Sequence, residues 1–502
     1  MPDRACRYLA VPATALLLCV LASGPAPADS LPSAATEECL TCHGTATPGI
    51  LQDWKRSRHA ATTLEEALKK PEHERRTSLP QAGATAEPAL RTAVGCAECH
   101  TRNPESHRDT FEHNGYQVHV VVTPEDCAGC HPREKEEYTG RNKMAHAYGN
   151  LRDNALYQKL ETAVIGLKGL QNGTLVTAPP TPGTRMDTCY GCHGTRVEVV
   201  GTRELDTEFG LMQVPDFSGW PNMGVGRVNP DGSLGSCSAC HPRHAFSIAV
   251  ARQPHVCSQC HLEPDAPAWN VYRESKHGNL YSSLASHWDF DAVPWRLGRD
   301  FQAPTCAACH ASLIADPEGT PVVERTHGYS DRLWVRLFGL VYSHPQPLSP
   351  DTRVIRNQDG LPLPTRFSGE PAASFLIDEP EQRTRQTRMM SLCRGCHSTR
   401  WTELHFEKLN HTLGEVDQMV LASTRLMEQA WHQGLASQTD PFDEPLETLW
   451  SEQWLFYANS IRYASAMTGA PDYAAFHNGW WKLSRGLREL QEAVSRPRDR
   501  RR

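Results

Sequence analysis

"CSACHPRHAFSIAVARQPHVCSQCH", residues 237–261, contains the pattern Cys-x-x-Cys-His twice, once at each end. The pattern occurs eight times in the chain and uses sixteen of its 18 cysteines. The other two, Cys6 and Cys19, lie near the amino terminus. The paired cysteines are Cys39 and Cys42, Cys96 and Cys99, Cys127 and Cys130, Cys189 and Cys192, Cys237 and Cys240, Cys257 and Cys260, Cys306 and Cys309, and Cys393 and Cys396. The histidines that follow them are His43, His100, His131, His193, His241, His261, His310 and His397.

This spacing is the attachment pattern of c-type haem. Cysteines at i and i+3 share one face of a helical turn, so both sulfurs can form thioethers to one porphyrin. The following histidine then presents its imidazole to the iron as the proximal ligand. A tetrahedral zinc site built from paired cysteines does not explain why a histidine follows every second cysteine. The sequence therefore predicts eight covalently bound haem c groups.

The spacing between motifs is irregular, from 20 residues between Cys237 and Cys257 to 87 between Cys306 and Cys393. The chain is therefore not a tandem array of identical modules. The mean hydropathy is -0.52. We expect the haems themselves to supply much of the apolar core.

The overall composition is that of a globular protein. The 502 residues are 39% hydrophobic and 22% charged, which allows a sizeable core and disfavours wholesale disorder. This length suits one large domain or two to three ordinary ones. The formal net charge of -7 gives no reason to expect nucleic acid as a partner.

The amino terminus has the pattern of a secretory signal peptide. Arg4 and Arg7 precede the apolar run 9–22, and "APA" at 26–28 fits a cleavage site. We expect residues 1–28 to be removed after Ala28 and the rest to be a soluble periplasmic protein. An uncleaved anchor is the alternative, although the apolar run is short for a membrane span.

Each haem iron has a second axial position, and sixteen further histidines could fill it. Six stand in settings that suit a distal ligand: His59, His119, His146, His244, His277 and His327. His107 and His113 compete for a seventh place. Weaker candidates are His255, His287, His344, His405, His411, His432 and His477. Sequence spacing does not assign any of them to a particular haem.

The predicted fold is mainly α, a multihaem cytochrome c with short motif-bearing helices and loops. Residues 29–375 carry seven motifs among connectors rich in proline and glycine, and 115–122 is a plausible strand. Residues 376–502 carry the eighth motif and then apolar residues at helical spacing. We expect three long helices there to form a carboxy-terminal bundle that ends in an arginine-rich tail.

Eight haem motifs followed by a cysteine-free helical region resemble the octahaem hydroxylamine oxidoreductase family. That family includes hydrazine dehydrogenases and nitrite-reducing relatives. Four stretches carry the resemblance beyond the motif count, and together they span nearly the whole mature chain. They are "GYQVHVVVTPEDCAGCH", "CSACHPRHAFSIAVARQPHVCSQCH", "ESKHG" with "APTCAACH", and "GAPDYAAFHNGWW".

The resemblance implies that seven haems are bis-histidine electron carriers and that the fourth, on Cys189, Cys192 and His193, is catalytic with an open distal face. In oxidative members a tyrosine from a neighbouring subunit is crosslinked to that haem. Tyr473 in "PDYAAFHNG" matches its position. The resemblance therefore implies a crosslink through Tyr473 and a homotrimer.

The family also places an Asp-His pair over the catalytic haem, soon after the sixth motif. Here Asp265 is present, but Ala266 occupies the histidine position. A carboxylate and an imidazole beside the substrate can act as general bases. Asp265 acts alone, a histidine from elsewhere replaces the missing one, or the substrate differs. By position, Tyr329 is a further candidate for the distal pocket.

Three functions follow from these features. The first is oxidation of a small nitrogen compound such as hydroxylamine at the fourth haem, with electrons passed to a soluble or membrane-associated cytochrome c. The second is the reverse direction, reduction of nitrite or hydroxylamine toward ammonia, which the departure at Ala266 keeps open. The third is a non-catalytic electron conduit in which all eight irons are six-coordinate.

Overall fold

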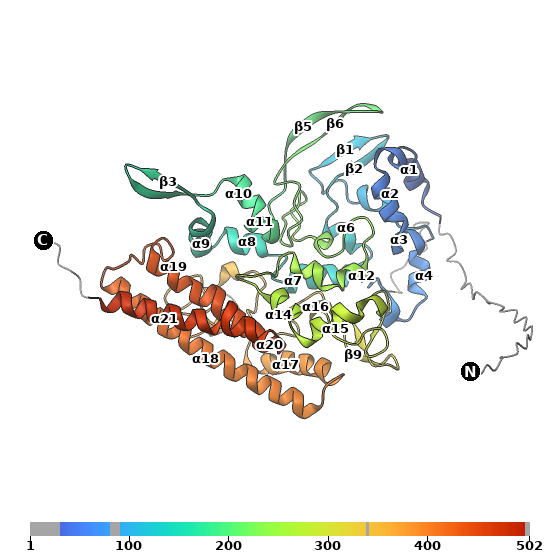
Figure 1. Cartoon of the computed structure of the whole chain (residues 1–502). Helices are drawn as coiled ribbons and strands as arrows, with labels where there is room; N and C mark the ends of the chain where they lie inside the picture. Colours follow the sequence, from blue (N-terminus) through green and yellow to red (C-terminus); the bar gives the residue numbers. More distant parts are fainter. Residues whose placement is uncertain (1–30, 81–90, 338–340, 497–502) are drawn as a thin grey trace, which may run out of the picture.

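The structure is a computed structural model that describes residues 31–80, 91–337 and 341–496 (Figure 1). The predicted signal peptide, the cysteines at 6 and 19, and residues 497–502 of the arginine-rich tail lie outside the described residues. Within the described ranges, no helix is both long enough and apolar enough to cross a lipid bilayer.

The amino-terminal two thirds consist of short helices joined by loops. Most helices in this region are one to three turns long, as we expected for motif-bearing segments. They are α1 (Ala34–Ala46), α2 (Pro48–Lys55), α3 (Arg58–Ala61), α4 (Leu64–Leu68), α5 (Cys96–His100), α6 (Pro124–Ala128), α7 (Pro132–Arg141), α8 (Ala147–Arg152), α9 (Ala155–Ile165), α10 (Pro182–Asp187), α11 (Cys189–His193), α12 (Ile248–Ala251), α13 (Pro254–Ser258), α14 (Ala268–Arg273), α15 (Lys276–Leu284) and α16 (Cys306–His310).

The strands form small antiparallel hairpins and short pairings. β1 (Thr110–His113) pairs with β2 (Tyr116–His119), which contains part of the strand predicted at 115–122. The hairpins β3 (Leu167–Gln171)–β4 (Thr174–Ala178) and β5 (Glu198–Thr207)–β6 (Gly210–Ser218) project from the body (Figure 1). The remaining strands are β7 (Trp295–Arg296), β8 (Ile314–Ala315), β9 (Pro321–Val323), β10 (Val335–Arg336) and β11 (His344–Pro345).

The carboxy-terminal region is a bundle of long helices (Figure 1). The first predicted helix is α18 (Thr399–His432), which follows α17 (Glu379–Arg394). The second is α19 (Pro445–Glu452) continued by a π-helical turn, Gln453–Tyr457, into α20 (Ala458–Met467). The third is α21 (Trp480–Ser495), preceded by another π-helical turn at Tyr473–His477. The prediction of a mainly α fold with a carboxy-terminal helical region is confirmed.

Ordinary hydrophobic packing holds the bundle together. Trp450 and Trp454 from the second helix and Leu483 and Leu490 from α21 are at most 1% exposed. They pack with Val420 and other residues of α18 in one cluster. Complete burial of such side chains contributes about 1.5–3 kcal/mol each. This part of the chain therefore has a side-chain core, to which Val341, Tyr342 and Leu363 from outside the bundle also contribute.

Arg462 of α20 ties the bundle to the haem-motif region. Its guanidinium is completely buried, and it forms an ion pair with Asp417 of α18. It also donates hydrogen bonds to the carbonyls of Leu337 and Val341, which lie between β10 and β11. A buried charge with several partners fixes the positions of these two residues, because removing any partner leaves polar groups unpaired.

We expect Arg462→Met to lower the free energy of unfolding by about 3–5 kcal/mol, because it leaves the Asp417 carboxylate without its cation and two buried carbonyls without their donor. Chemical denaturation followed by far-UV circular dichroism measures the change. Arg485→Met is the matched control, since Arg485 forms an exposed i,i+4 pair with Glu489. Such a pair contributes about 0.5 kcal/mol or less. Equal effects of the two substitutions would contradict the anchoring role of Arg462.

Candidate haem sites and active site

Each Cys-x-x-Cys-His motif lies on a helical turn or directly at its end. In the third, fifth, sixth and eighth motifs the backbone amide of the histidine donates to the carbonyl of the first cysteine, at 2.9–3.0 Å. This i to i+4 bond places the two thiols and the imidazole on one side of the turn. None of the described cysteines forms a disulfide. The residues therefore fit thioether attachment of haem.

Three motif histidines face a second histidine at the distance that one iron requires. Two imidazoles on one iron place their ring centroids about 6 Å apart, because each Nε2 lies about 2 Å from the metal. The centroid separations are 6.1 Å for His43 and His113, 6.3 Å for His131 and His59, and 6.1 Å for His397 and His277. These pairs offer both axial ligands for the first, third and eighth haems.

The second motif has two histidines near its proximal ligand, His100. The ring centroid of His119 lies 6.0 Å from that of His100, and the centroid of His244 lies 6.5 Å away. Nε2 of His119 hydrogen-bonds to the carbonyl of Arg102, and the carbonyl of His119 accepts from Nδ1 of His100. Nδ1 of His119 is buried and has no hydrogen-bond partner among the described residues, so both His119 and His244 stay candidates for the distal ligand of the second haem.

The other two predicted ligands lie near other motifs. Burial, with a contribution from His241, lowers the pKa of His327 to about 3, so its imidazole is neutral, as an iron ligand must be. Its Nδ1 is buried and has no hydrogen-bond partner among the described residues. His146 hydrogen-bonds to the carbonyl of Thr139. It directly precedes Ala147, whose carbonyl contacts Nδ1 of His193 at 3.4 Å.

His107, which competed for a seventh ligand place, is held between two carboxylates. Its Nδ1 lies 3.2 Å from Asp109 and its Nε2 lies 3.2 Å from Asp126, and all three side chains are buried. Burial opposes a charge on His107, but the hydrogen bonds to the two carboxylates outweigh it and raise the pKa to about 9. With both nitrogens engaged, His107 is a structural imidazolium. His113 is the histidine that lies opposite a motif.

His255, a weaker candidate in the sequence, lies beside the seventh motif. Its Nδ1 is 3.2 Å from the hydroxyl of Tyr281, which leaves Nε2 as the nitrogen suited to a metal. Tyr281 and Tyr272 are both within electrostatic range of Cys306. His255 also lines a cavity of about 560 Å³ with Trp269 and Tyr281. In the sequence, only the position of His255 shortly before the sixth motif indicates that it could lie near a haem.

The thiols of the eight motifs form a connected series of neighbours. Some pairs are in hydrogen-bond contact and the others are within electrostatic range. Because each thiol is bound to a porphyrin edge in a c-type haem, neighbouring thiols bring haem edges close together. The pairs are Cys39 with Cys96, Cys99 with Cys130, Cys127 with Cys237, Cys240 with Cys257, Cys257 with Cys306, Cys260 with Cys192, and Cys309 with Cys393.

The sixth motif is the branch point of this series. Its Cys257 meets the fifth and seventh motifs, and its Cys260 hydrogen-bonds with Cys192 of the fourth. Within the described residues, these thiol contacts place the fourth motif at the end of a side branch. The first and eighth motifs lie at the two ends of the main series. Among the described cysteines, two are exposed, namely Cys42 and Cys396, one from each end of the series.

The fourth motif is held by close backbone packing. Gly194 directly follows the motif and has φ +92°, a conformation that favours glycine. A Cβ at Gly194 would lie 2.4 Å from the amide nitrogen of Arg227. Arg227 is only 2% exposed and donates to Asn229 and to the carbonyl of Asn222. This packing fixes the backbone that directly follows His193.

Asp265 lies beside the fourth motif although it follows the sixth in sequence. It is within electrostatic range of Cys189, Cys192 and His193. Its backbone carbonyl accepts a hydrogen bond from Asn459 of α20 at 3.0 Å. Ala266 is only 6% exposed, so the surrounding chain covers its methyl group. The structure thus brings a carboxylate, and no imidazole from position 266, to this site.

Two predicted tyrosines lie at different places. The hydroxyl of Tyr473 donates to the carboxylate of Glu263 at 3.0 Å, so it lies next to the loop that carries Asp265. Tyr329 is within electrostatic range of Cys240 and Cys257, which belong to the fifth and sixth motifs. The structure therefore brings Tyr473, but not Tyr329, close to the Asp265 loop.

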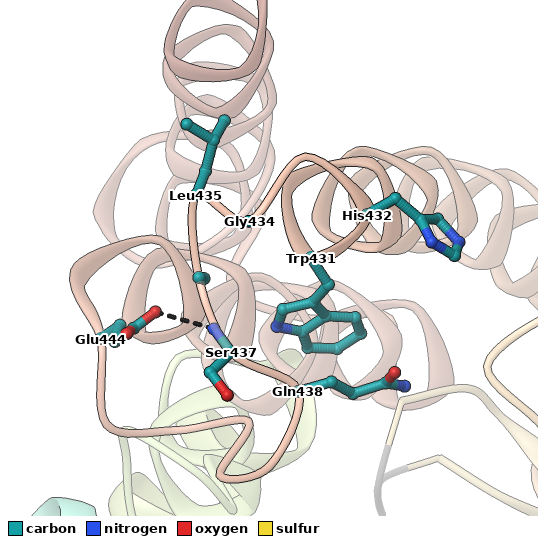
Figure 2. Close-up of a pocket in the computed structure, with 8 residues that line it drawn as sticks. Trp431, His432, Gly434, Leu435, Ser437, Gln438 and Glu444 are labelled. Carbon is teal, nitrogen blue, oxygen red and sulfur yellow. Dashed lines mark hydrogen bonds between the residues drawn. The ribbon is translucent and has the colours of Figure 1, made fainter. Parts of the chain in front are cut away.

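A second cavity, of about 470 Å³, lies in the turn that joins α18 and α19 (Figure 2). Trp431, Gln438 and Glu444 contribute to its walls, and the backbone of Ser437 donates to Glu444. No motif cysteine or motif histidine lines it. The cavity therefore has no evident connection with the haem sites.

Comparisons with known proteins agree with this geometry. Residues 231–320 match a family model described as "Seven times multi-haem cytochrome CxxCH", and residues 38–120 match "Cytochrome c554 and c-prime". A solved structure described as a hypothetical multiheme protein is 39% identical, with a TM-score of 0.85. The alignment covers 92% of this chain and 95% of that one. The chain belongs to the multihaem cytochromes c.

Two further relatives of this multihaem cytochrome come from Kuenenia stuttgartiensis. A probable nitrite reductase-hydroxylamine oxidoreductase fusion protein is 24% identical over 409 residues, which are 78% of this chain but 37% of that protein. The chain thus spans little more than a third of that relative's length. A reducing HAO-like protein complex shares the fold at 18% identity and a TM-score of 0.53, covering 92% of this chain and 85% of that one.

We expect His59→Ala, His113→Ala and His277→Ala each to convert one low-spin haem of this multihaem cytochrome into a high-spin haem, because each removes one of two imidazoles from an iron. Electron paramagnetic resonance of the oxidised protein counts the two forms. His411→Ala, on the exposed face of α18, is the control and should leave the count unchanged. A variant that retains the parent spectrum would disprove the corresponding pair.

His107→Phe should lower the free energy of unfolding by about 3–5 kcal/mol, because it leaves two buried carboxylates without their counter-ion. Against the effect of burial, His107 lowers the pKa of Asp109 and of Asp126. The stability that these carboxylates contribute is lost as the pH falls below 3.8, their ordinary pKa. The stability that His107 contributes is fully present below its ordinary pKa of 6.5. It is lost as the pH rises through about 9, the pKa of His107 in the folded protein.

The difference in stability between the parent and His107→Phe should therefore be largest between pH 3.8 and pH 6.5 and should shrink above pH 9. Thermal unfolding across this range measures it. A difference that does not vary with pH would show that the imidazolium does not pair with the two carboxylates.

Proposed function

We propose that this chain is a periplasmic octahaem oxidoreductase that oxidises a small nitrogen compound, such as hydroxylamine, at an open fourth haem. The observation that carries the proposal is that the Asp265 carboxylate lies within electrostatic range of Cys189, Cys192 and His193. Oxidation of such a compound releases protons as electrons leave, and a nearby carboxylate can accept them. The bound haem would supply the site at which the substrate loses its electrons.

In this proposal the chain's own residues have separate tasks. Asp265 accepts a proton from the substrate, and Asn459 holds the loop of Asp265 through its backbone carbonyl. His193 is the proximal ligand, and its Nδ1 is oriented toward the carbonyl of Ala147. The haems held by the fourth and sixth motifs would exchange electrons, and the neighbouring Cys192 and Cys260 would bring the edges of these two haems close together.

The proposal extends to the assembly and the electron acceptor. The family resemblance would put Tyr473 of one subunit at the fourth haem of a neighbouring subunit in a homotrimer and crosslink the two, whereas in the single chain Tyr473 donates to Glu263 of the same chain. A soluble or membrane-associated cytochrome c takes up the electrons at one end of the series. The apolar run at residues 9–22, followed by "APA", supports export and cleavage near Ala28.

Reduction of nitrite or hydroxylamine toward ammonia is the second candidate function. Burial lowers the pKa of His193, and Arg336 contributes to the decrease, so a guanidinium lies within electrostatic range of this histidine. Lys143 lies within range of Arg336 in turn. Positive charge near an open iron would favour an anion such as nitrite. A non-catalytic conduit is the third candidate, and it requires eight six-coordinate irons.

We expect Asp265→Asn to lower the rate of hydroxylamine-dependent cytochrome c reduction by about 10²–10⁴-fold, because it removes the proton acceptor. Asp472→Asn, an exposed change next to Tyr473, is the matched control and should retain activity. Nitrite consumption with an artificial reductant is measured in parallel. If nitrite consumption is the faster reaction and hydroxylamine oxidation is negligible, the second candidate replaces the first.

Tyr473→Phe should abolish a haem-peptide crosslink while all eight haems stay attached, because the phenol oxygen and the activation of its ring are lost. Mass spectrometry of haem peptides and the optical spectrum measure both properties. Identical peptides and spectra for the parent and the variant would refute the crosslink. A parent spectrum without any high-spin haem would refute both catalytic proposals and favour the conduit.

A further inference from the structure

His344 is a buried histidine in the described chain that the haem pairs above do not use. It begins β11 and is 2% exposed. Its Nδ1 lies 2.7 Å from the carbonyl of Pro345, so Nδ1 carries the proton and donates it to that oxygen. Its Nε2 is buried and has no hydrogen-bond partner among the described residues. An unpaired buried polar atom costs about 1–3 kcal/mol, which indicates that a ligand completes it.

The β10–β11 pair places His344 among groups that can bind a polar ligand. Arg336 lies directly opposite His344 in the antiparallel register, so the two side chains share one face of the ribbon. Gln346, two residues further along, is on the same face by strand periodicity. Nζ of Lys143 donates to the side-chain oxygen of Gln346. This face therefore carries an imidazole, a guanidinium and an amide whose oxygen accepts from a lysine.

One residue of this face, Arg336, lies near the fourth motif. Arg336 and Asp265 are both within electrostatic range of His193, and both are within range of Tyr463 in α20. Arg462 donates to the side-chain oxygen of Asn459, which in turn holds the carbonyl of Asp265. As described above, Arg462 also donates to the carbonyls of Leu337 and Val341, which lie between β10 and β11. One hydrogen-bond network thus positions the ribbon of His344 and the loop of Asp265 together.

The electrostatic surroundings keep His344 neutral. Burial, then Arg336 and then Lys143 lower its pKa well below the ordinary range, and Arg462 acts in the same direction, while the hydrogen bond to Pro345 opposes them. With Nδ1 protonated, the Nε2 lone pair is available to accept a hydrogen bond or a proton. A neutral imidazole of this kind is the group that is missing at Ala266.

We propose that His344 is the imidazole of the fourth-haem pocket and accepts a proton from the substrate through Nε2, which rests on the proposed function. The substrate's O–H or N–H bond breaks and an Nε2–H bond forms. The electron pair of the broken bond stays on the substrate, from which the haem series removes electrons. The imidazolium then passes its proton to Asp265 or to water. Ala266 is consistent with this arrangement because the base comes from β11.

The test uses the full holoprotein with His344→Ala and His344→Gln, the second to preserve the side-chain volume if the first folds poorly. His411→Ala, which should match the parent throughout, is the control. We expect both His344 variants to keep eight haems and the parent's single high-spin signal in electron paramagnetic resonance. Binding of hydroxylamine to the oxidised protein, followed by optical difference spectra, should weaken about tenfold for the loss of one hydrogen bond.

We also expect the rate of hydroxylamine oxidation in His344→Ala to fall by about 10²–10⁴-fold, the effect of losing a general base. A new high-spin haem in either variant would overturn the proposal, because it would make His344 an axial ligand. Parent-like binding together with a parent-like rate would overturn it as well. If the parent itself lacks a high-spin haem, the proposed function fails, whereas the other two outcomes concern His344 alone.

Discussion

The geometry of a single helical turn is the constraint on which the rest of this structure depends. Cysteines at i and i+3 and a histidine at i+4 must face one side for one haem to be attached and ligated. The chain repeats this turn eight times and places the cysteines of one copy beside those of the next, rather than joining the copies by long elements of secondary structure. The loops can therefore vary in length, because each motif needs only to bring its sulfurs beside those of the next. This accounts for the irregular spacing between the motifs.

The carboxy-terminal bundle is built on a different principle. Its tryptophans and leucines bury one another, so it has a core that needs no cofactor. Yet it is not an independent appendage, because Arg462 and Asn459 in α20 hold the segments that surround the fourth motif. The π-helical turn at Tyr473–His477 likewise brings Tyr473 to Glu263. A conventionally packed region thus positions residues around the predicted catalytic haem.

The electrostatics around the fourth motif are mixed. Asp265 brings a negative charge, whereas Arg336 of β10 brings a positive charge. A neutral substrate that loses protons benefits from the first group, and an anion benefits from the second. Under the two proposed functions, the first group favours oxidation and the second favours reduction at this site. His344 belongs to the same set of groups, because burial and the neighbouring Arg336 and Lys143 lower its pKa.

The sequence by itself determined what depends on neighbours along the chain. The eight motifs, their proximal histidines and the three carboxy-terminal helices follow from periods of three to four residues. The second histidine that faces each motif histidine does not follow from such periods. Folding over long stretches of chain brings the two together, as it brings His277 to His397. His107 has the same residue type as a ligand, but Asp109 and Asp126 occupy its nitrogens. Only the tertiary structure could decide between these roles, because they depend on which groups lie within a few ångströms in space.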